Sequence, residues 1–212
     1  FNSSVISCSG WNADGGGSIA VDNSILTVNS CLFIDDRNFA DWGGAIKMFN
    51  ASPVVTVSNT TFNRCSSRRG GAIYQGSGVL TVTGSYFSNN FTAGDASDPL
   101  NGGGAFYKLA GTTTFSNCVF TGNYNDQVAN PNNGSVDGGA LLFRSATGTF
   151  VFNTCSFSNN IPFDKGCDFY LDKGATGTGT ITNCTFGPTS GANGAAKVNI
   201  YNFDMAATDV VL

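Results

Sequence analysis

Apolar positions recur along this chain in a short pattern of fixed spacing. An apolar residue is followed three positions later by a small residue and five positions later by Phe. The six full copies are Val28-Cys31-Phe33, Val57-Thr60-Phe62, Val82-Ser85-Phe87, Phe115-Cys118-Phe120, Phe152-Cys155-Phe157 and Ile181-Cys184-Phe186. Val5 and Cys8 form an earlier, degenerate copy in which Gly10 replaces the Phe. Leu26 and Val28 alternate with Thr27, which predicts a strand with one inward apolar face.

A second motif, a glycine pair followed by a small and then an apolar residue, alternates with the first. Its copies are Gly16-Gly17-Ser18-Ile19, Gly43-Gly44-Ala45-Ile46, Gly70-Gly71-Ala72-Ile73, Gly103-Gly104-Ala105-Phe106, Gly138-Gly139-Ala140-Leu141 and the degenerate Gly166-Cys167-Asp168-Phe169. The number of residues from this motif to the apolar residue that opens the next copy of the first motif barely changes. The number of residues from each Phe to the next glycine motif varies widely. Insertions are therefore confined to one corner of a repeating unit.

These repeats predict an all-β fold, a parallel β-helix (solenoid) of about seven coils. No segment is long enough to bury its own apolar face, so equivalent residues must stack between coils. A β-sandwich would not require a repeated Gly-Gly corner, and strict spacing argues against disorder. We expect repeats over residues 1–194 and a strand-like tail over 195–212 that caps the helix or pairs with another subunit.

Composition supports this fold and narrows the partners. The chain has 28 Gly, 18 Phe, no His and 14 acidic residues, all of them Asp. Long helix-forming side chains are scarce. A net charge of −4 argues against a nucleic-acid partner, and no apolar run is long enough to predict a membrane span. Because the chain starts at Phe1, we expect a processed or truncated segment.

The paired motifs resemble a known family. Gly-Gly-Ala-Ile together with Phe-x-x-Asn, seen at Phe87/Asn90, Phe120/Asn123 and Phe157/Asn160, is similar to the repeat of chlamydial polymorphic outer membrane proteins. The Asn is replaced at Asp36 and Cys65. The resemblance covers roughly residues 5–190 and implies a right-handed parallel β-helix at a cell surface or outside the cell. The translocator barrel of that family has no counterpart here.

Catalytic and metal-binding patterns are weak. Asp35 and Asp36 are adjacent and should point to opposite faces of a strand, and no His is present. Asp14, Asp41 and Asp137 precede glycine corners, while Arg68, Arg69 and Lys165 occupy equivalent places in other coils. Turns with exposed ion pairs explain this better than calcium binding. The sequence predicts neither an enzyme nor a cofactor.

Five of the seven cysteines occupy the small-residue slot, where Thr60 and Ser85 also occur. Side chains stacked in register are too far apart for a typical disulfide, so we interpret them as small core residues. Cys65 and Cys167 lie outside the slot and are the candidates for chemistry or crosslinking. Candidate N-glycosylation sites, where glycans could be attached covalently, are Asn2, Asn50, Asn59, Asn90, Asn133 and Asn183.

The first functional hypothesis is an extracellular structural protein that assembles end to end with copies of itself, into a fibre or surface layer. The segments 197–203 and 210–212 are strand-like, and neither end resembles a polar cap. The second is a cell-surface adhesin or binding module that uses loops 91–101 and 124–137. Their candidate interaction residues are Phe91, Asp95, Asp98, Leu100, Tyr124, Asp126, Val128 and Asn132. A polysaccharide-active enzyme is the third alternative.

Overall fold

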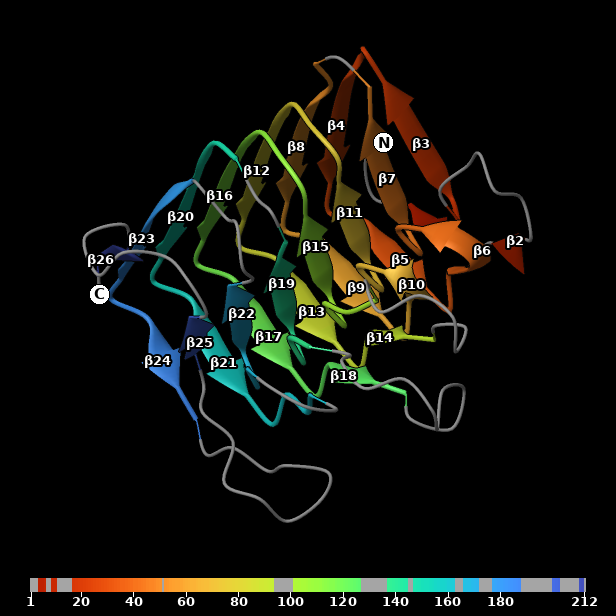
Figure 1. Cartoon of the computed structure of the whole chain (residues 1–212). Helices are drawn as coiled ribbons and strands as arrows, with labels where there is room; N and C mark the ends of the chain where they lie inside the picture. Colours follow the sequence, from red (N-terminus) through yellow and green to blue (C-terminus); the bar gives the residue numbers. More distant parts are fainter. Residues whose placement is uncertain are drawn as a thin grey trace.

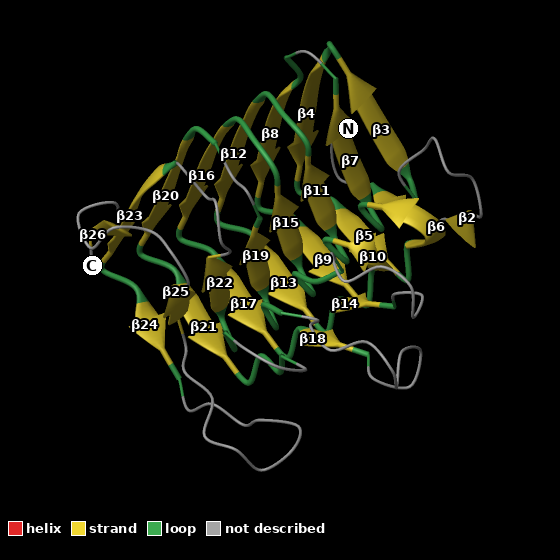
Figure 2. Cartoon of the chain, viewed as in Figure 1, coloured by secondary structure: helices red, strands yellow, loops and turns green. Residues whose placement is uncertain are grey.

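The computed structural model describes residues 4–6, 9–10, 17–50, 52–93, 101–126, 137–144, 147–162, 166–171, 177–187, 200–202 and 210–211. The chain winds as a parallel β-solenoid, with coil following coil from the N-terminal to the C-terminal end (Figure 1). The described residues form strands and loops without a helix (Figure 2). The predicted all-β parallel β-helix is thus confirmed.

Four parallel sheets form the sides of the solenoid, and two of them carry the apolar repeat. Sheet A comprises β4 (Ile25–Asn29), β8 (Val54–Ser58), β12 (Val79–Thr83), β16 (Thr112–Ser116), β20 (Thr149–Asn153), β23 (Thr178–Thr182) and β26 (Val210–Val211). Sheet B comprises β1 (Val5–Ile6), β5 (Leu32–Ile34), β9 (Thr61–Asn63), β13 (Tyr86–Ser88), β17 (Val119–Thr121), β21 (Ser156–Ser158) and β24 (Thr185–Phe186).

The other two sheets flank the glycine corner. Sheet C comprises β2 (Ser9–Gly10), β6 (Arg37–Trp42), β10 (Ser66–Arg69), β14 (Phe91–Thr92) and β18 (Tyr124–Asn125). Sheet D comprises β3 (Ile19–Asp22), β7 (Ile46–Phe49), β11 (Ile73–Gln75), β15 (Phe106–Lys108), β19 (Leu141–Phe143), β22 (Phe169–Leu171) and β25 (Ile200–Asn202). Each full coil therefore passes through sheets D, A and B in turn, and the coils up to β18 also contribute a strand to sheet C.

The predicted number of coils is too high. Sheets A, B and D each contain seven strands, but sheet C contains five, so the described chain makes about five turns rather than about seven. The motif count included the outermost coils, which contribute strands to some sides only. The degenerate first copy was also placed in the wrong register: Val5 pairs with Leu32, and Ile6 rather than Gly10 aligns with Phe33. The Phe33 ring needs an apolar side chain above it, which Gly10 does not have. Gly10 instead pairs with Asn38 in sheet C.

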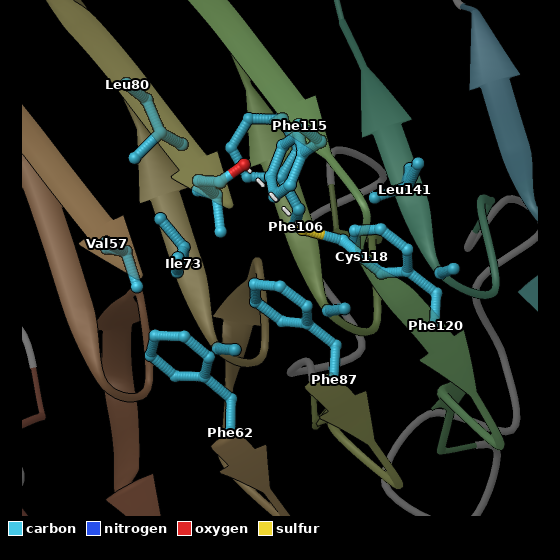
Figure 3. Close-up of a cluster of buried hydrophobic side chains, with 14 of the residues drawn as sticks. Val57, Phe62, Ile73, Leu80, Phe87, Phe106, Phe115, Cys118, Phe120 and Leu141 are labelled. Atoms are coloured by element: carbon cyan, nitrogen blue, oxygen red, sulfur yellow. Dashed lines mark hydrogen bonds between the residues drawn. The ribbon is translucent and has the colours of Figure 1, made fainter. Parts of the chain in front are cut away.

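The predicted phenylalanines form one column inside sheet B. Successive ring centroids in the series Phe33, Phe62, Phe87, Phe120, Phe157 and Phe186 are 4.9, 4.8, 4.7, 4.9 and 5.2 Å apart, with near-parallel planes. Figure 3 shows part of this column beside the aliphatic side chains of sheets A and D. Five of the six rings are buried, and only Phe186 is not. Burying one Phe contributes roughly 1.5–3 kcal/mol to the stability of the fold. The column is the main apolar contact between coils.

The two glycines of the corner have different roles. The first has a left-handed backbone, with φ of 68° at Gly43 and 66° at Gly70, a region that non-glycine side chains rarely adopt. The second is required by close packing, since a Cβ built on Gly71 would lie 2.1 Å from the carbonyl oxygen of Gly104 in the next coil. The first glycine is therefore required by its backbone conformation and the second by the close approach of the next coil.

The described parts of the C-terminal tail continue the solenoid. In β25, Ile200 pairs with Phe169, and in β26, Val210 pairs with Gly179. These strands extend sheets D and A of their own chain. The tail thus pairs within the chain at these positions.

Candidate functional sites

The small-residue slot lies at the bend between sheets A and B. The residue just before the slot has a left-handed backbone in every full copy: Ser30, Asn59, Gly84, Asn117, Thr154 and Asn183, with φ between 48° and 58°. The slot side chain then donates to the carbonyl two residues earlier, as from Thr60 Oγ1 to Ser58 at 2.8 Å. It also accepts from the backbone of the preceding coil, as from the Cys31 amide at 3.2 Å. A small donor is therefore favoured at this position.

This geometry supports the interpretation of the slot cysteines as core residues. Cys31, Cys118 and Cys155 are buried, and none of the six cysteines that the structure describes forms a disulfide. Cys118 and Cys155 lie in neighbouring coils, and the hydrogen bond between them, together with burial, raises the pKa of the Cys155 thiol. A buried thiol held in the protonated form, as at Cys155, is a poor nucleophile.

A polar ladder runs beside the Phe column, formed by the Asn of the Phe-x-x-Asn motif. Asn123 Nδ2 donates to the Phe87 carbonyl at 3.1 Å and to Asn160 Oδ1 at 3.0 Å. Its own Oδ1 accepts from the backbone and the side chain of Asn90, both at 3.0 Å. Asn90 and Asn160 repeat this pattern in their coils. The ladder thus satisfies buried backbone groups at the bend that follows sheet B.

Other residue types end this ladder. Asp36 and Cys65 continue it toward the N-terminus; Asp36 is fully buried and accepts from the Ser18 hydroxyl. At the opposite end Asn160 Nδ2 donates to Asp168 Oδ1 at 2.7 Å. Burial raises the pKa of Asp168 to about 6, against the effect of that hydrogen bond. The role of these buried carboxylates was not foreseen, although Asp36 replaces Asn in the motif.

Burial counts against three of the sequence-based site assignments. Asn90 was a glycosylation candidate, but it is fully buried and its Nδ2 already donates two hydrogen bonds. Cys65 was a candidate for chemistry or crosslinking, but burial, with a further contribution from Asp36, raises the pKa of its thiol. Cys167, the second such candidate, is also fully buried. None of the three is accessible in the folded chain.

The remaining glycosylation candidates differ in position. Asn50, Asn59 and Asn183 are exposed at turns, each with a left-handed backbone. Asn2 and Asn133 lie outside the described residues. The three exposed sites stay predictions.

Sheet C, at the variable corner, carries the bases of the two predicted interaction loops. Phe91 and Tyr124 pair in β14 and β18, and their rings stack at 5.1 Å. They therefore belong to strands rather than to the loops, which corrects the predicted loop starts. Asp126 is half-buried just after β18. The candidates within the loops, which are Asp95, Asp98, Leu100, Val128 and Asn132, lie outside the described residues.

The two loops also return to neighbouring positions. Gly102 and Asp137 form a parallel bridge just before their glycine corners. Because both ends of each loop lie next to those of the other, the chain leaves and re-enters the solenoid at adjacent points. This placement agrees with loops in adjacent coils at one corner. Burial, followed by the charge of Asp126, raises the pKa of the Tyr124 hydroxyl at this place.

At the glycine corner Arg69 contacts aromatic rings, while Asp14 and Lys165, two of the charges predicted there, lie outside the described residues. Trp42, Arg69, Gly102 and Asp137 are successive neighbours in the column before the corner. The Arg69 guanidinium lies 4.9 Å from the Trp42 ring and 5.7 Å from the Tyr107 ring. Tyr74, Tyr107, Leu142 and Tyr170 form a separate buried cluster with Trp42 on the outer side of sheet D.

Asp35 forms ion pairs at the bend after sheet B. Asp35 accepts from Arg64 Nε at 2.8 Å, and Arg37 lies 3.9 Å away. The Arg64 hydrogen bond lowers the pKa of Asp35. Asp35 is partly exposed and Asp36 buried, so the two carboxylates point to opposite sides as expected.

A buried amine interrupts the apolar interior of sheet D. Lys108 follows Met48 and Gln75 in one inward column, and its Nζ donates to Thr113 Oγ1 and to the Thr149 carbonyl, both at 2.9 Å. Burial lowers the pKa of Lys108 to about 7. The position of Lys108 was not predicted, although alternation from Phe106 places it on the inward side of the strand.

At the C-terminal end of the described coils, a cavity of about 250 Å³ opens between sheets A, B and D. It is lined by Ile181, Asn183, Cys184, Phe186 and Ile200. Phe186 is the last ring of the Phe column and is only half-buried. The cavity therefore marks the place where the apolar interior approaches the surface.

Among the described residues, no group of three or more acidic or Cys side chains could hold a metal ion, and no helix could cross a membrane. No family model, curated protein or solved structure matches this chain. The fold and its surfaces are therefore the basis for the functional argument.

Proposed function

We propose that this chain is a non-catalytic structural subunit, located outside the cell or on its surface, that assembles end to end with copies of itself. The same proposal includes kinship with the β-helices of chlamydial polymorphic outer membrane proteins, on the strength of the shared motifs. Extracellular placement follows from that kinship. We also propose that glycans are attached to Asn50, Asn59 or Asn183, because these side chains are exposed.

The observation that carries the proposal is the apolar cavity at the last described coil. Its wall includes Phe186, the end of a column that repeats every 4.7–5.2 Å through the molecule. A further coil, supplied by a second copy, would continue both the column and the sheets. Strands at the ends of a solenoid favour such augmentation because their backbone groups can pair with another strand.

Carboxyl, thiol and amine side chains of the kinds that enzymes use in catalysis are buried in the core, which also supports a structural role. Asp36, Asp168, Cys65 and Lys108 are buried, and each is hydrogen-bonded to neighbouring coils or to other parts of its own coil. Groups fixed in this way hold the coils in register. A catalytic site would need such groups to converge on a substrate-accessible cleft.

The test is the size of the protein in solution, measured by sedimentation velocity and electron microscopy over a range of concentrations. We expect wild-type polymers and a monomeric Phe186→Asp variant, because a carboxylate would disrupt an apolar end contact. Thr185→Asp, which places the charge on the adjacent exposed residue, is the matched control and should still polymerise. Circular dichroism would check that both variants fold. A wild-type chain that stays monomeric would rule out end-to-end assembly.

The second candidate is a surface adhesin, favoured by the adjacent loop bases. Both loops start in paired strands, β14 and β18, and end at the bridged residues Gly102 and Asp137. Loops that leave and return side by side can act as one binding site. If the wild-type chain is monomeric, exchanging residues 127–135 for a Gly/Ser linker should abolish attachment to host or matrix surfaces. Unchanged attachment would contradict this function.

A further inference from the structure

The outer side of sheet A is unusual in its composition. Its outward residues form three columns, hereafter the sheet A face: Ile25, Val54, Val79, Thr112, Thr149, Thr178; Thr27, Thr56, Thr81, Thr114, Val151, Thr180; and Asn29, Ser58, Thr83, Ser116, Asn153, Thr182. Ten of these are Thr, four are Ile or Val, and none is charged or aromatic. The face therefore presents methyl and hydroxyl groups almost exclusively.

The positions of these groups form a regular two-dimensional array. All five strand pairings from β4 to β23 keep the same register without a shift, whereas sheet C shifts between Ser67 and Arg69. Neighbouring strands lie about 4.8 Å apart, and outward residues along one strand lie about 6.6 Å apart. Figure 1 shows these strands running side by side along one flank.

The array is held by a tightly packed interior. Val28, Val57 and Val82 lie on the inward side of the same strands and are fully buried. β-Branched side chains have few χ1 rotamers, so most methyl and hydroxyl groups of the face have restricted orientations. Thr149 Oγ1 lies 3.5 Å from Thr112 Oγ1, which shows that hydroxyl groups of adjacent coils are close neighbours. The face is thus rigid as well as regular.

The face is also accessible. Ile25, Val54 and Val79 are 82%, 37% and 41% exposed. Thr27, Thr56, Thr112, Thr149 and Thr178 are exposed as well. The apolar side chains cluster toward the N-terminal coils, and the Thr residues extend the surface toward the C-terminal coils.

We propose that the sheet A face binds ice. The spacings between its equivalent side chains are similar to the spacings between equivalent oxygen atoms in the planes of an ice crystal. Exposed methyl groups favour an ordered water layer, while hydroxyl groups at matching intervals can hydrogen-bond to it. Charged groups, which hold strongly oriented hydration shells of their own, are absent from the face.

Other ligands fit this face less well. Proteins are usually bound through Trp, Tyr and Arg anchors, and aromatic rings provide the apolar platform for sugars; the face has none of these residues. Six strands of five residues cover a projected area of roughly 500 Å², which is small for a stable protein interface that buries roughly 800 Å² of accessible surface per partner. A crystal surface needs no such anchor, because many weak contacts repeat over the whole array.

The experiment measures how much of the full chain is captured by a slowly growing ice front, together with the shaping of single ice crystals. We expect wild-type protein to enter the ice and to shape crystals. Thr81→Lys places a charge at the centre of the face, between Thr56 and Thr114, and should reduce capture roughly tenfold, since an unpaired charge must lose its water there. Thr61→Lys, a half-exposed position on sheet B, is the matched control and should be captured like wild type.

Four outcomes would overturn the proposal. Wild-type protein that is excluded from ice as completely as an unrelated protein would show that the array does not match the crystal. Equal loss of capture in Thr61→Lys and Thr81→Lys would place binding elsewhere. If ice capture is absent and wild-type protein binds cellulose or chitin particles, loss of that binding in Thr81→Lys would assign the face to a polysaccharide. If ice capture is absent and wild-type protein dimerises in solution, loss of the dimer in Thr81→Lys would assign the face to a second copy. Matching melting curves for the variants show that folding is retained.

Discussion

The Phe column and the polar ladder pass through the same coils, three residues apart in each repeat, yet they join the coils in different ways. The column needs only an apolar ring or chain of suitable size, so Ile6 can stand above Phe33. The ladder needs a donor and an acceptor at each step, as Asn123 provides toward Asn90 and Asn160. The comparison teaches that stacking gives stability, whereas the ladder sets which residues lie opposite each other.

The largest effect is expected from removing a ring in the middle of the column. Phe120→Ala should lower the free energy of unfolding by about 3–5 kcal/mol, because the cavity between Phe87 and Phe157 cannot be filled by neighbouring coils. Urea unfolding followed by circular dichroism measures this change. A variant as stable as wild type would show that the column is not the main contact between coils.

A smaller loss is expected from interrupting the ladder. Asn123→Ala should cost about 2–3 kcal/mol, since it leaves the Asn90 amide and the Phe87 carbonyl without these partners. Thr121→Ala, which changes an outward residue of the same coil, is the control and should cost much less. The same unfolding experiment compares the two. Equal losses would mean that the ladder contributes no more than surface contacts.

The end of the ladder should depend on pH. In the folded chain, burial raises the pKa of Asp168 from 3.8 to about 6, so the folded state binds this proton more tightly. The resulting stability is present below pH 4 and is lost as the pH rises from about 4 to about 6, an effect of roughly 2 kcal/mol.

Asp168→Asn isolates this contribution, because an amide oxygen can still accept from Asn160. The difference in unfolding free energy between the variant and wild type should grow from pH 4 to pH 7 and then stay constant. Chemical denaturation at several pH values measures it. A pH-independent difference would contradict a raised pKa of Asp168 in the folded chain.

The smallest effect is expected at the variable corner, where sheet C lacks the apolar column. Deleting residues 127–135 should change the unfolding free energy by less than about 0.5 kcal/mol, because β18 and the Gly102–Asp137 bridge remain on either side. Thermal unfolding and circular dichroism measure the change. Loss of folding would show that the insertion is part of the structural unit, and would weaken the adhesin hypothesis.

Much of the repeat could be predicted from spacing alone. Val28, Cys31 and Phe33 identify one strand, one bend and the next strand, because side chains alternate between the faces of a strand. Gly70 and Gly71 identify a corner because a side chain at either position would strain or crowd the backbone. The degenerate copy at Val5 was placed in the wrong register, since a partial coil lacks the motif residues that define it.

The site residues were harder to predict. Asn90 has a sequon that marks it as exposed, yet it is buried, because a sequon depends only on neighbouring residues and burial depends on the next coil. Phe91 and Tyr124 were assigned to loops, since nothing in a two-residue strand distinguishes it from the start of an insertion.

By itself, the sequence determined that the chain is a parallel β-solenoid, which residues form the Phe column, and where insertions occur. These properties follow from spacing within one coil, and each coil repeats them. Only the tertiary structure decided that Asp36 and Asp168 close the ladder, that the Lys108 amine donates to the Thr149 carbonyl of the next coil, and that Arg69 packs on Trp42. Each of these depends on contacts between residues about 8 to 41 positions apart, which become neighbours only when insertions of unequal length have set the register between coils.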